Sequence, residues 1–599
     1  MGSTHKRPGS PATKPAATEN GSKSSANWAT IRNVTLRQWL YLPRLFSRRE
    51  GMRILIVGGL ALVALGVLGT RLIVRITVMR PAVSGTLREG IIREPRFINP
   101  VFASNDADRD IASLVFSKLI RYDPRGEAAM DLAEKVETSA DGRTYTVHLR
   151  RGIKWHDGEN FSADDVIFTV KTIQDPEYKS PLRQNWQGVA VEKIDDFTLR
   201  FVLRQTYAPF LENLSLGIIP EHLWRKIPRG TAVLSDLNLK PVGTGPYAFN
   251  KLTRRADGSI ISVSLTRNKN YYLEGPFIKE VIFSVYDSDA ELVASYRRNE
   301  IDSLFLTSAE SAGELKPLDV KLFRLSLPKI FAVFLNPGAN PPLGRKAVRQ
   351  ALMSAVEREA IIANAAGDGG ILVNSAIPPG TFGFNPDINP PKYDLAYAQK
   401  LLKDDGWKEG KGDGVLERSE GRAKNRKTEK LEIRLVTSDS PELAKTAELI
   451  AGMWRALGVK TEVKIMPIND LESSVIRPRA YEALLFGEVL GHDPDPFAFW
   501  HTSQLKDPGL NIALYSNRAV DSLLEGARST SEPSLREAKY REFQRLVASD
   551  SGAIFLYSPN AYYAIRKNVQ GVVLDAVTLP DERFNGINSW YVGTGRKLK

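Results

Sequence analysis

The stretch of residues 144–173 constrains the fold of this chain more than any other. It begins with six residues in which apolar and polar side chains alternate, as they do in a half-buried β-strand. Asp157-Gly158 follows, a dipeptide that accepts the positive φ of a tight turn. Ser162, with Asp165 three residues later, then gives a helix start of the capping-box type. The stretch predicts a strand, a turn and a helix, which alone is typical of any surface β–α connection.

Two motifs in this stretch, RGIKWHDG at 151–158 and FSADDV at 161–166, closely resemble those of the peptide/nickel/opine class of extracellular solute-binding proteins. These proteins feed ABC importers. Further stretches resemble the class in the same order: PVGTGPY at 241–247, NKNYY at 268–272, LNP at 335–337 before GRKAVRQAL at 344–352, and DPDPF at 493–497. On this resemblance the chain is identified as a member of the class.

The resemblance implies an α/β fold with two lobes, like that of periplasmic binding proteins, with an extra domain in the first lobe. The sequence itself adds one transmembrane helix in front of this fold. The resemblance implies a function by binding: a cleft between the lobes closes by a hinge motion over a peptide or similar extended solute, which is delivered to a permease. Such clefts hold the peptide backbone as an added strand. The resemblance also implies separately encoded ABC permease and ATPase subunits, and a monomeric binding protein.

We expect the following parts along the chain: a disordered basic cytoplasmic tail (1–52), a transmembrane anchor (53–79), lobe I in three parts (84–126, 241–335 and 553–599), its extra domain (127–240) and lobe II (336–552). The tail has too few large apolar side chains to fold. Residues 111–122 have the apolar spacing of a helix, and the continuous apolar run at 331–335 predicts a buried strand. A strand–helix–strand pattern at 431–465 predicts parallel strands.

The segment Ile54–Thr70 contains seventeen residues without a charge, and residues 72–79 extend it, with Arg71 and Arg75 able to reach the headgroups. A signal peptide is the alternative, but the run exceeds a usual signal core and no small-x-small cleavage site precedes Arg71. We therefore expect an uncleaved anchor. Arginines flank it on both sides, so charge does not orient it. The resemblance implies a single-pass cell-membrane protein whose large C-terminal domain is extracellular or periplasmic.

The formal net charge of +13 is concentrated near the N-terminus, where residues 1–53 contain ten Lys or Arg and two Asp or Glu. The remainder is mildly basic and lacks aromatic residues interleaved with Arg and Lys, so we expect no nucleic-acid partner. The sequence contains no cysteine. This excludes disulfides, thiolate nucleophiles, sulfur-ligated metals and a lipid-modified cysteine anchor.

The sequence offers little support for catalysis. The six histidines show no H-E-x-x-H or H-x-H spacing, and no G-x-S-x-G motif is present. Residues 406–412 approximate a phosphate loop but lack Ser or Thr after the lysine. We therefore expect no enzyme activity, metal or cofactor. Three alternatives to a peptide importer component remain: a binder of a non-peptide solute, an anchored envelope hydrolase, and an envelope protein with a structural or other non-transport role.

Residues 481–501 form the second informative stretch. Residues 481–486 resemble a buried strand, and the loop after it lies where open α/β sheets place ligands, beyond the carboxyl end of a strand. Asp493 and Asp495 are alternatively Asx-turn residues before their prolines, with the nearby aromatic residues packed inside the lobe. Residues 488–491 are expected to face the cleft.

This loop also departs from the family pattern. Peptide binders that hold a free α-amino group carry an aspartate shortly before the D-P-D residues, where this chain has Leu490-Gly491. The charge-assisted bond to a peptide amine is therefore missing, unless Glu488 supplies it. A neutral loop would tolerate N-blocked, internal or non-peptide ligands. The candidate ligand-binding residues are Glu94, Asn99, Gly487, Glu488, Val489, Leu490, His492, Trp500 and Tyr557.

Overall fold

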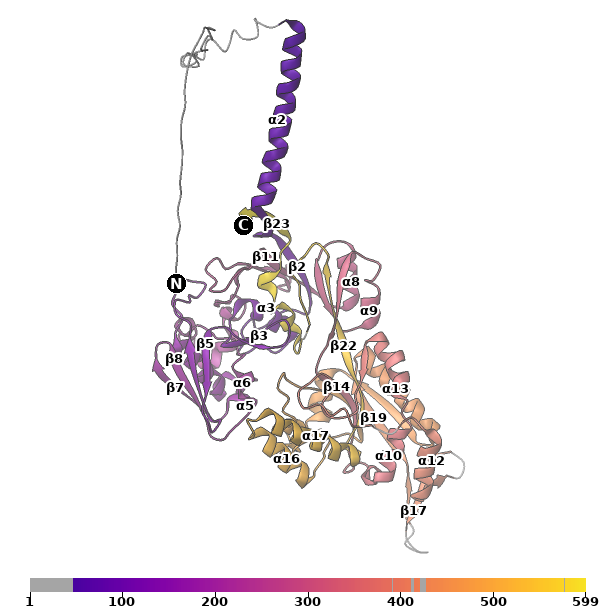
Figure 1. Ribbon diagram of the computed structural model, residues 1–599. Helices are drawn as coiled ribbons and strands as arrows, with labels where there is room; N and C mark the ends of the chain where they lie inside the picture. The colour runs from indigo at the N-terminus through magenta and orange to yellow at the C-terminus, as the bar shows by residue number, and fades with distance from the viewer. Residues whose placement is uncertain (1–46, 390–391, 411–413, 421–426, 576, 599) are drawn as a thin grey trace, which may run out of the picture. The chain divides into compact units, whose positions relative to one another are not determined.

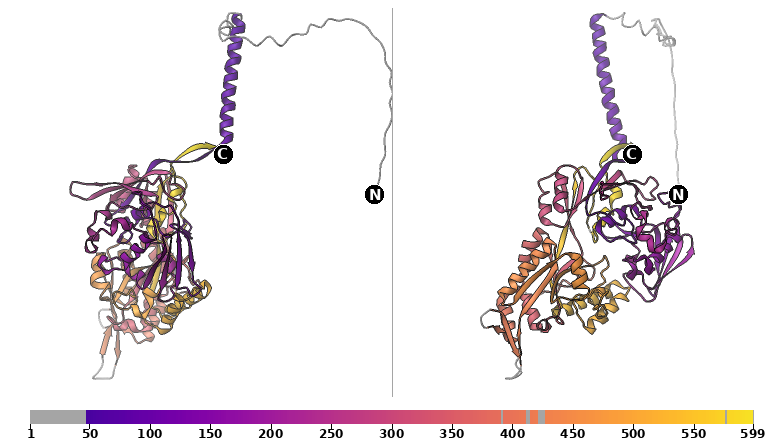
Figure 2. Two further views of the ribbon diagram at one scale, coloured as in Figure 1. Left: turned by 90° about the vertical axis from the view of Figure 1, so that its left-hand side faces the viewer. Right: turned by 180° about the vertical axis from the view of Figure 1, so that it is seen from behind.

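The computed structural model describes residues 47–389, 392–410, 414–420, 427–575 and 577–598 (Figures 1 and 2). The chain divides into two compact units, residues 1–80 with 596–599, and residues 81–595. Most of the predicted disordered tail, residues 1–46, lies outside the described residues.

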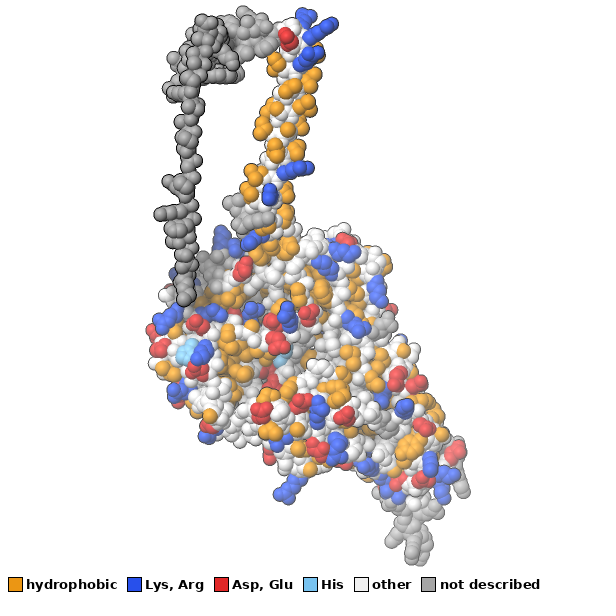
Figure 3. Space-filling view, viewed as in Figure 1, with side chains coloured by type: hydrophobic (Ala, Val, Ile, Leu, Met, Phe, Trp, Pro, Cys, Tyr) orange, Lys and Arg blue, Asp and Glu red, His pale blue; other side chains and the backbone are white. Residues whose placement is uncertain are grey.

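The described part of the first unit is dominated by one helix, α2 (Arg48–Ile76). By length and composition α2 is apolar enough to cross a membrane. Its apolar side chains are exposed along its length (Figure 3). The helix begins at Arg48, so residues 48–52 are helical although the sequence predicted them as tail. It ends where β1 (Thr77–Ala82) begins, and β1 pairs with β23 (Gly593–Leu598).

In the described part of residues 81–595, twelve strands form one mixed sheet. Ten of them follow in the order β20, β19, β21, β14, β22, β12, β2, β11, β10 and β9, while β13 and β15 pair with β22 beside this path. Their bounds are β2 Ser84–Ile92, β9 Tyr247–Arg254, β10 Ile260–Arg267, β11 Ile278–Tyr286, β12 Ser303–Leu306, β13 Val320–Ser326, β14 Lys329–Leu335, β15 Gly370–Leu372, β19 Glu432–Ser438, β20 Lys460–Met466, β21 Ala483–Val489 and β22 Ile554–Arg566.

Two sets of hydrophobic cores divide this unit into what we call lobe II, residues 329–557, and lobe I, the remainder. β14 lies inside the lobe II part of the sheet, and alternate side chains from Ile330 to Leu335 enter cores on opposite faces. Burial of both faces explains the continuous apolar run, and the strand predicted at 331–335 is confirmed.

Helices cover both faces of the lobe II sheet (Figure 1). One face packs against α10 (Lys346–Ser354), α11 (Arg358–Ile361), α12 (Leu395–Asp404) and α13 (Pro441–Ala456); the other packs against α14 (Ile468–Leu471), α15 (Phe497–Trp500), α16 (Arg518–Arg528) and α17 (Pro533–Ser549). The parallel pairing predicted within 431–465 is confirmed, because β19 and β20 pair in parallel. The strands β16 (Lys408–Glu409), β17 (Leu416–Glu420) and β18 (Lys427–Lys430) form a separate antiparallel sheet.

Lobe I carries a second, four-stranded sheet of β5 (Ala133–Thr138), β6 (Thr144–Leu149), β8 (Thr198–Leu203) and β7 (Val189–Asp195). Its core is continuous with that of the large sheet. Around it lie β3 (Ile120–Tyr122), β4 (Ala128–Met130), α3 (Asp106–Val115), α4 (Ala163–Gln174), α5 (Arg183–Trp186), α6 (Phe210–Asn213) and α7 (Glu221–Trp224), while α8 (Asp289–Arg297) and α9 (Ala309–Gly313) cover the other face of the large sheet.

Local signals in lobe I were partly correct. The strand, turn and helix predicted at 144–173 are present as β6 and α4, and Ser162 and Asp165 form the capping box. The helix predicted at 111–122 was wrong in its bounds: α3 ends at Val115 and residues 120–122 form β3. Ile120 pairs with Met130 across β3 and β4, a strand pairing that the apolar spacing does not reveal.

Candidate functional site

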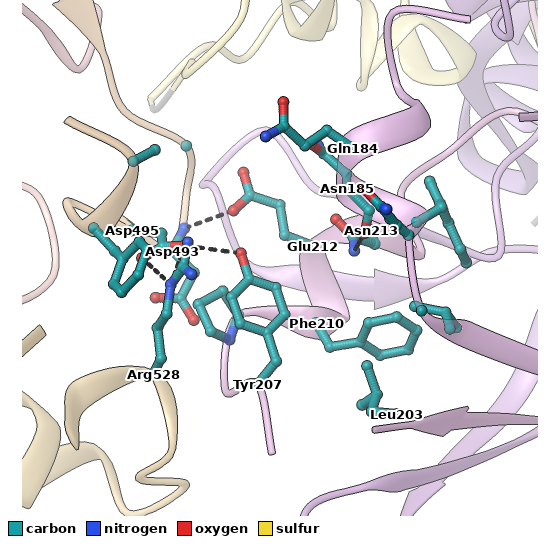
Figure 4. A pocket seen from close by; sticks show the side chains of 18 of the residues that line it. Gln184, Asn185, Leu203, Tyr207, Phe210, Glu212, Asn213, Asp493, Asp495 and Arg528 are labelled. Carbon is teal, nitrogen blue, oxygen red and sulfur yellow. Dashed lines mark hydrogen bonds and ion pairs between the residues drawn. The ribbon is translucent and has the colours of Figure 1, made fainter. Parts of the chain in front are cut away.

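A cavity of about 1370 Å3 lies between the two lobes. From lobe I it is lined by Leu579 and by some of the residues within 182–216, and from lobe II by some of the residues within 489–529. Figure 4 shows Glu212, Asn213, Asn185 and Gln184 on one side, facing Asp493, Asp495 and Arg528 on the other. Small-molecule sites usually occupy about 300–1,000 Å3, so this cavity can hold a larger or more extended ligand.

The loop after β21 contacts lobe I through Glu212 at the end of α6. The Glu212 carboxylate accepts hydrogen bonds from the backbone N–H groups of His492, at 2.9 Å, and Asp493, at 3.3 Å. A Cβ atom at Gly491 would lie 2.1 Å from Glu212 Oε1. The absence of a side chain at Gly491 therefore makes room for this carboxylate from the opposite lobe.

Glu212 lies in a low-dielectric position on the cavity wall. Burial raises the pKa of its carboxyl to about 7, although the His492 N–H group favours the ionised form. Among the described residues, Glu212 forms no ion pair with a Lys or Arg side chain. Its carboxylate can therefore receive a positively charged group from a ligand.

The two aspartates of the D-P-D motif form side-chain contacts across the loop. Arg528 of α16 donates to both carboxylate oxygens of Asp495, and Tyr207 of lobe I donates to Asp495 at 3.1 Å. Arg536 of α17 pairs with Asp493. Both carboxylates thus hold the loop in place by binding side chains of other elements. The Asx-turn alternative predicted bonds to the neighbouring backbone only, and so did not include this role.

His492 provides a further contact between the lobes. Its Nε2 atom lies 2.7 Å from the carboxylate of Glu582, its Nδ1 atom lies 3.1 Å from the Thr578 hydroxyl, and its ring stacks on Tyr122 with centroids 3.5 Å apart. All three partners belong to lobe I. His492 is therefore a residue of the lobe contact, and it is absent from the residues that line the cavity.

β21 extends to Val489, beyond the predicted end of the strand, because it pairs with β14 along residues 483–489. Gly487, Glu488 and Val489 are thus strand residues, so the side chains of Glu488 and Val489 point to opposite faces of the sheet. Val489 and Leu490 line the large cavity. Glu488 is buried near Trp500 within lobe II, and burial raises the pKa of its carboxyl to about 8.

The remaining candidates lie elsewhere. Gly487 pairs with Phe331 across β21 and β14, and the ring of Tyr557 packs on that of Phe331 with centroids 5.5 Å apart, near the point where the chain crosses between lobes. The Tyr557 hydroxyl lies 3.2 Å from that of Thr446. Asn99 is buried in lobe I, where its side chain accepts from the Val101 N–H, and Glu94 is half-buried after β2. The structure brings Val489 and Leu490 together at the cavity, while Glu94 and Asn99 are not among its lining residues.

Sequence reasoning missed Glu212, Tyr207 and Arg528. Glu212 belongs to a four-residue helix without a motif, and its role depends on a loop 280 residues later in the chain. The Leu490-Gly491 pair was the one feature of the sequence that could have indicated this contact. A glycine at a position where the family pattern has a larger residue indicates that another group approaches the backbone closely.

The comparison with known families decides what kind of protein carries this cavity. The profile of the bacterial extracellular solute-binding proteins, family 5 (middle part), matches residues 127–509, more than half of the chain. The chain belongs to this family. The resemblance inferred from its motifs is confirmed.

Curated relatives match this solute-binding protein along most of their length. The oligopeptide-binding protein AppA of Bacillus subtilis is 27% identical over 522 residues, covering 86% of this chain and 92% of the relative. The dipeptide-binding protein of Escherichia coli is 26% identical over 509 residues, covering 80% and 90%.

Solved structures of similar proteins share the fold. AppA from Bacillus subtilis in complex with a nonapeptide matches with a TM-score of 0.70 at 25% identity, covering 86% of this chain and 100% of AppA. NikZ from Campylobacter jejuni in complex with Ni(L-His) matches with a TM-score of 0.70 at 27% identity, covering 84% and 99%. The predicted two-lobed α/β fold is confirmed. Among the described residues, no group of three or more His, Asp or Glu side chains is arranged to hold a metal ion.

Proposed function

We propose that this protein is the substrate-binding component of an ABC importer and captures peptides, or similarly extended solutes, in the cavity between its lobes. It acts by binding and delivery, without catalysis or a cofactor, and as a monomer. Separately encoded permease and ATPase subunits receive and move the solute. The large cavity lined by both lobes is the observation that carries this proposal, and the peptide-binding relatives support it.

Within this proposal, Val489 and Leu490 contact the ligand, because they line the cavity. Polar side chains on the lobe I side, including Asn185 and Asn213, are suited to the N–H and C=O groups of a peptide backbone. Contacts with the ligand from Glu94, Asn99, Gly487, His492, Trp500 and Tyr557 stay predictions. For Glu488 we now expect no direct contact, because its carboxyl is buried near Trp500 and is not among the residues that line the cavity. A non-peptide solute is the second candidate, because Leu490-Gly491 replaces the amine-binding aspartate of the family pattern.

We further propose that α2 anchors the protein, with residues 81–595 on the outer side of the membrane. Chains beginning at Ser84 should then be soluble and monomeric, because they keep the hydrophobic cores of residues 81–595 and lack the apolar helix. Size-exclusion chromatography with light scattering measures this, with the full chain in detergent as the control. Aggregation of the shortened chain beside a well-behaved full chain would show that the apolar segment belongs to the fold.

The central test is ligand-induced closure. Because the chain has no cysteine, Ile194→Cys in lobe I with Leu535→Cys in lobe II gives two unique spin-label sites; both side chains are exposed. Mass spectrometry of the full chain purified in detergent first identifies a co-purified solute. Adding that solute to ligand-free protein should shorten the distance between the labels, as the lobes rotate at the crossings near Lys329 and Tyr557.

A matched label pair within lobe II, Ile465→Cys with Leu535→Cys, should show no change. Identical distance distributions for the inter-lobe pair throughout a saturating titration would contradict a binding protein that closes over its solute.

A further inference from the structure

Lobe II contains a second cavity, of about 250 Å3, which shares no lining residue with the large one. It lies where the ends of α10 and α17 meet the start of α11 and of β22, and residues 374–389 complete its wall. The volume is below that of a typical drug-sized site. Only a small ligand fits this cavity.

The inner wall of this cavity combines apolar side chains with one guanidinium group. Phe555, Ile388 and Ala553 are buried and line it. Arg358, the first residue of α11, lines it as well, and only 8% of this residue is exposed to solvent. This combination matches ligands that have one charged end and an apolar body.

Arg358 has little compensation for its buried charge. Its Nη1 atom donates to Asn374 Oδ1 at 3.3 Å. Within the described part of the chain, Arg358 forms no ion pair within 4 Å; Glu359, beside it in the sequence, is exposed. Burial accordingly lowers the pKa of Arg358. A buried charge without a counter-charge is unfavourable, so an anion from outside the chain would be bound favourably here.

The other charged groups of the cavity lie on its rim. Arg545 is exposed and already pairs with Glu542 of the same helix, at 2.6 Å. Asp387 is exposed as well. This arrangement leaves Arg358 as the inner partner for an anion, while Asp387 at the entrance disfavours ligands with several negative charges.

We propose that this cavity binds a small organic monocarboxylate, whose charged end pairs with Arg358 and whose apolar body packs against Phe555 and Ile388. Carboxylates match the planar fork of a guanidinium group and bind it through two parallel hydrogen bonds. The site is independent of the solute held between the lobes, because the two cavities share no lining residue.

Ligand-observed ¹⁹F NMR with 4-fluorobenzoate tests this site on the full chain in non-ionic detergent. Saturable binding is expected for the unchanged protein. Arg358→Met should weaken it by about tenfold or more, because a hydrogen bond to a charged group is lost. Arg541→Met, the same change on α17 but outside the cavity lining, should bind nearly as the unchanged protein does. The neutral analogue 4-fluorobenzyl alcohol should bind at least about tenfold more weakly than the carboxylate.

Ala548→Leu provides a second variant, which fills the cavity and keeps Arg358. It too should lose 4-fluorobenzoate binding, so the test remains decisive where Arg358→Met fails to fold. No saturable binding to the unchanged protein, equal binding of acid and alcohol, or unchanged binding in either Arg358→Met or Ala548→Leu would each overturn the proposal. If the probe instead bound in the large cavity, neither substitution would change its binding, and this too would overturn the proposal.

Discussion

Arg583→Met is expected to destabilise lobe I by about 3–5 kcal/mol, because it leaves two buried carboxylates without their counter-charge. Arg583 donates to both oxygens of Asp110, at 2.7 and 2.6 Å, and to Glu89 at 2.9 Å. Arg583 is 1% exposed and Glu89 is fully buried. Glu89 also accepts from the hydroxyl groups of Tyr563 and Ser303.

This network joins distant parts of lobe I. Glu89 lies on β2, Asp110 on α3 and Tyr563 on β22, while Arg583 belongs to residues 580–584 near the C-terminus. Residues 580–584 are thus held to β2 by a buried ion pair. Loss of Arg583 should loosen the segment and the central strands together.

Hydrogen exchange measured by mass spectrometry on the full chain reads this effect locally. The free energy of opening should fall in peptides from β2, β12 and β22, and stay unchanged in peptides from β19 and β20 of lobe II. Arg541→Met is the matched control, because Arg541 pairs with Glu537 on the exposed face of α17. Such exposed pairs contribute about 0–1 kcal/mol. Equal effects of the two substitutions would contradict a structural role of the buried network.

The sequence predicted the fold where local pattern and burial agree. β14 is apolar at every position from Ile330 to Leu335 because helices cover both faces of the sheet. The capping box at Ser162 depends on residues three positions apart, so the start of α4 was predicted correctly. In contrast, the end of α3 at Val115 and the length of β21 depend on pairing between strands, which the residue spacing within one segment does not show.

The candidate site was predicted less well, because its geometry arises between the lobes. The expected direction of Glu488 rested on a strand ending at residue 486, but pairing with β14 extends β21 and turns this side chain into lobe II. Glu212 lies in a four-residue helix, which is too short to show a recognisable apolar pattern in the sequence. The sequence nevertheless indicated the right loop, since Val489, Leu490 and Gly491 line the cavity.

Glu212→Gln is expected to weaken binding of free-amine peptides by about tenfold or more, while N-acetylated peptides respond little. The reason is the loss of a charge-assisted bond, worth about 1.5–3 kcal/mol. The amide oxygen that this substitution introduces can still accept an N–H group of the loop, which keeps the lobe contact. Glu488→Gln is the matched control: its carboxyl is buried near Trp500, outside the cavity lining, so it should affect both peptides equally or not at all.

Calorimetry with matched free and acetylated peptides gives a further signature of Glu212. Burial raises the pKa of this carboxyl to about 7, and an ammonium group beside it lowers that pKa again, so binding near neutral pH releases a proton. Affinity for the free peptide should therefore rise between about pH 5.5 and 7.5. Over this range the α-amino group of the peptide stays mostly protonated, because its usual pKa is about 7.7–8.0. Glu212→Gln should abolish this rise. A slope that survives the substitution, or equal losses for both peptides, would sink the amine-binding role of Glu212 and favour a solute without a free amine.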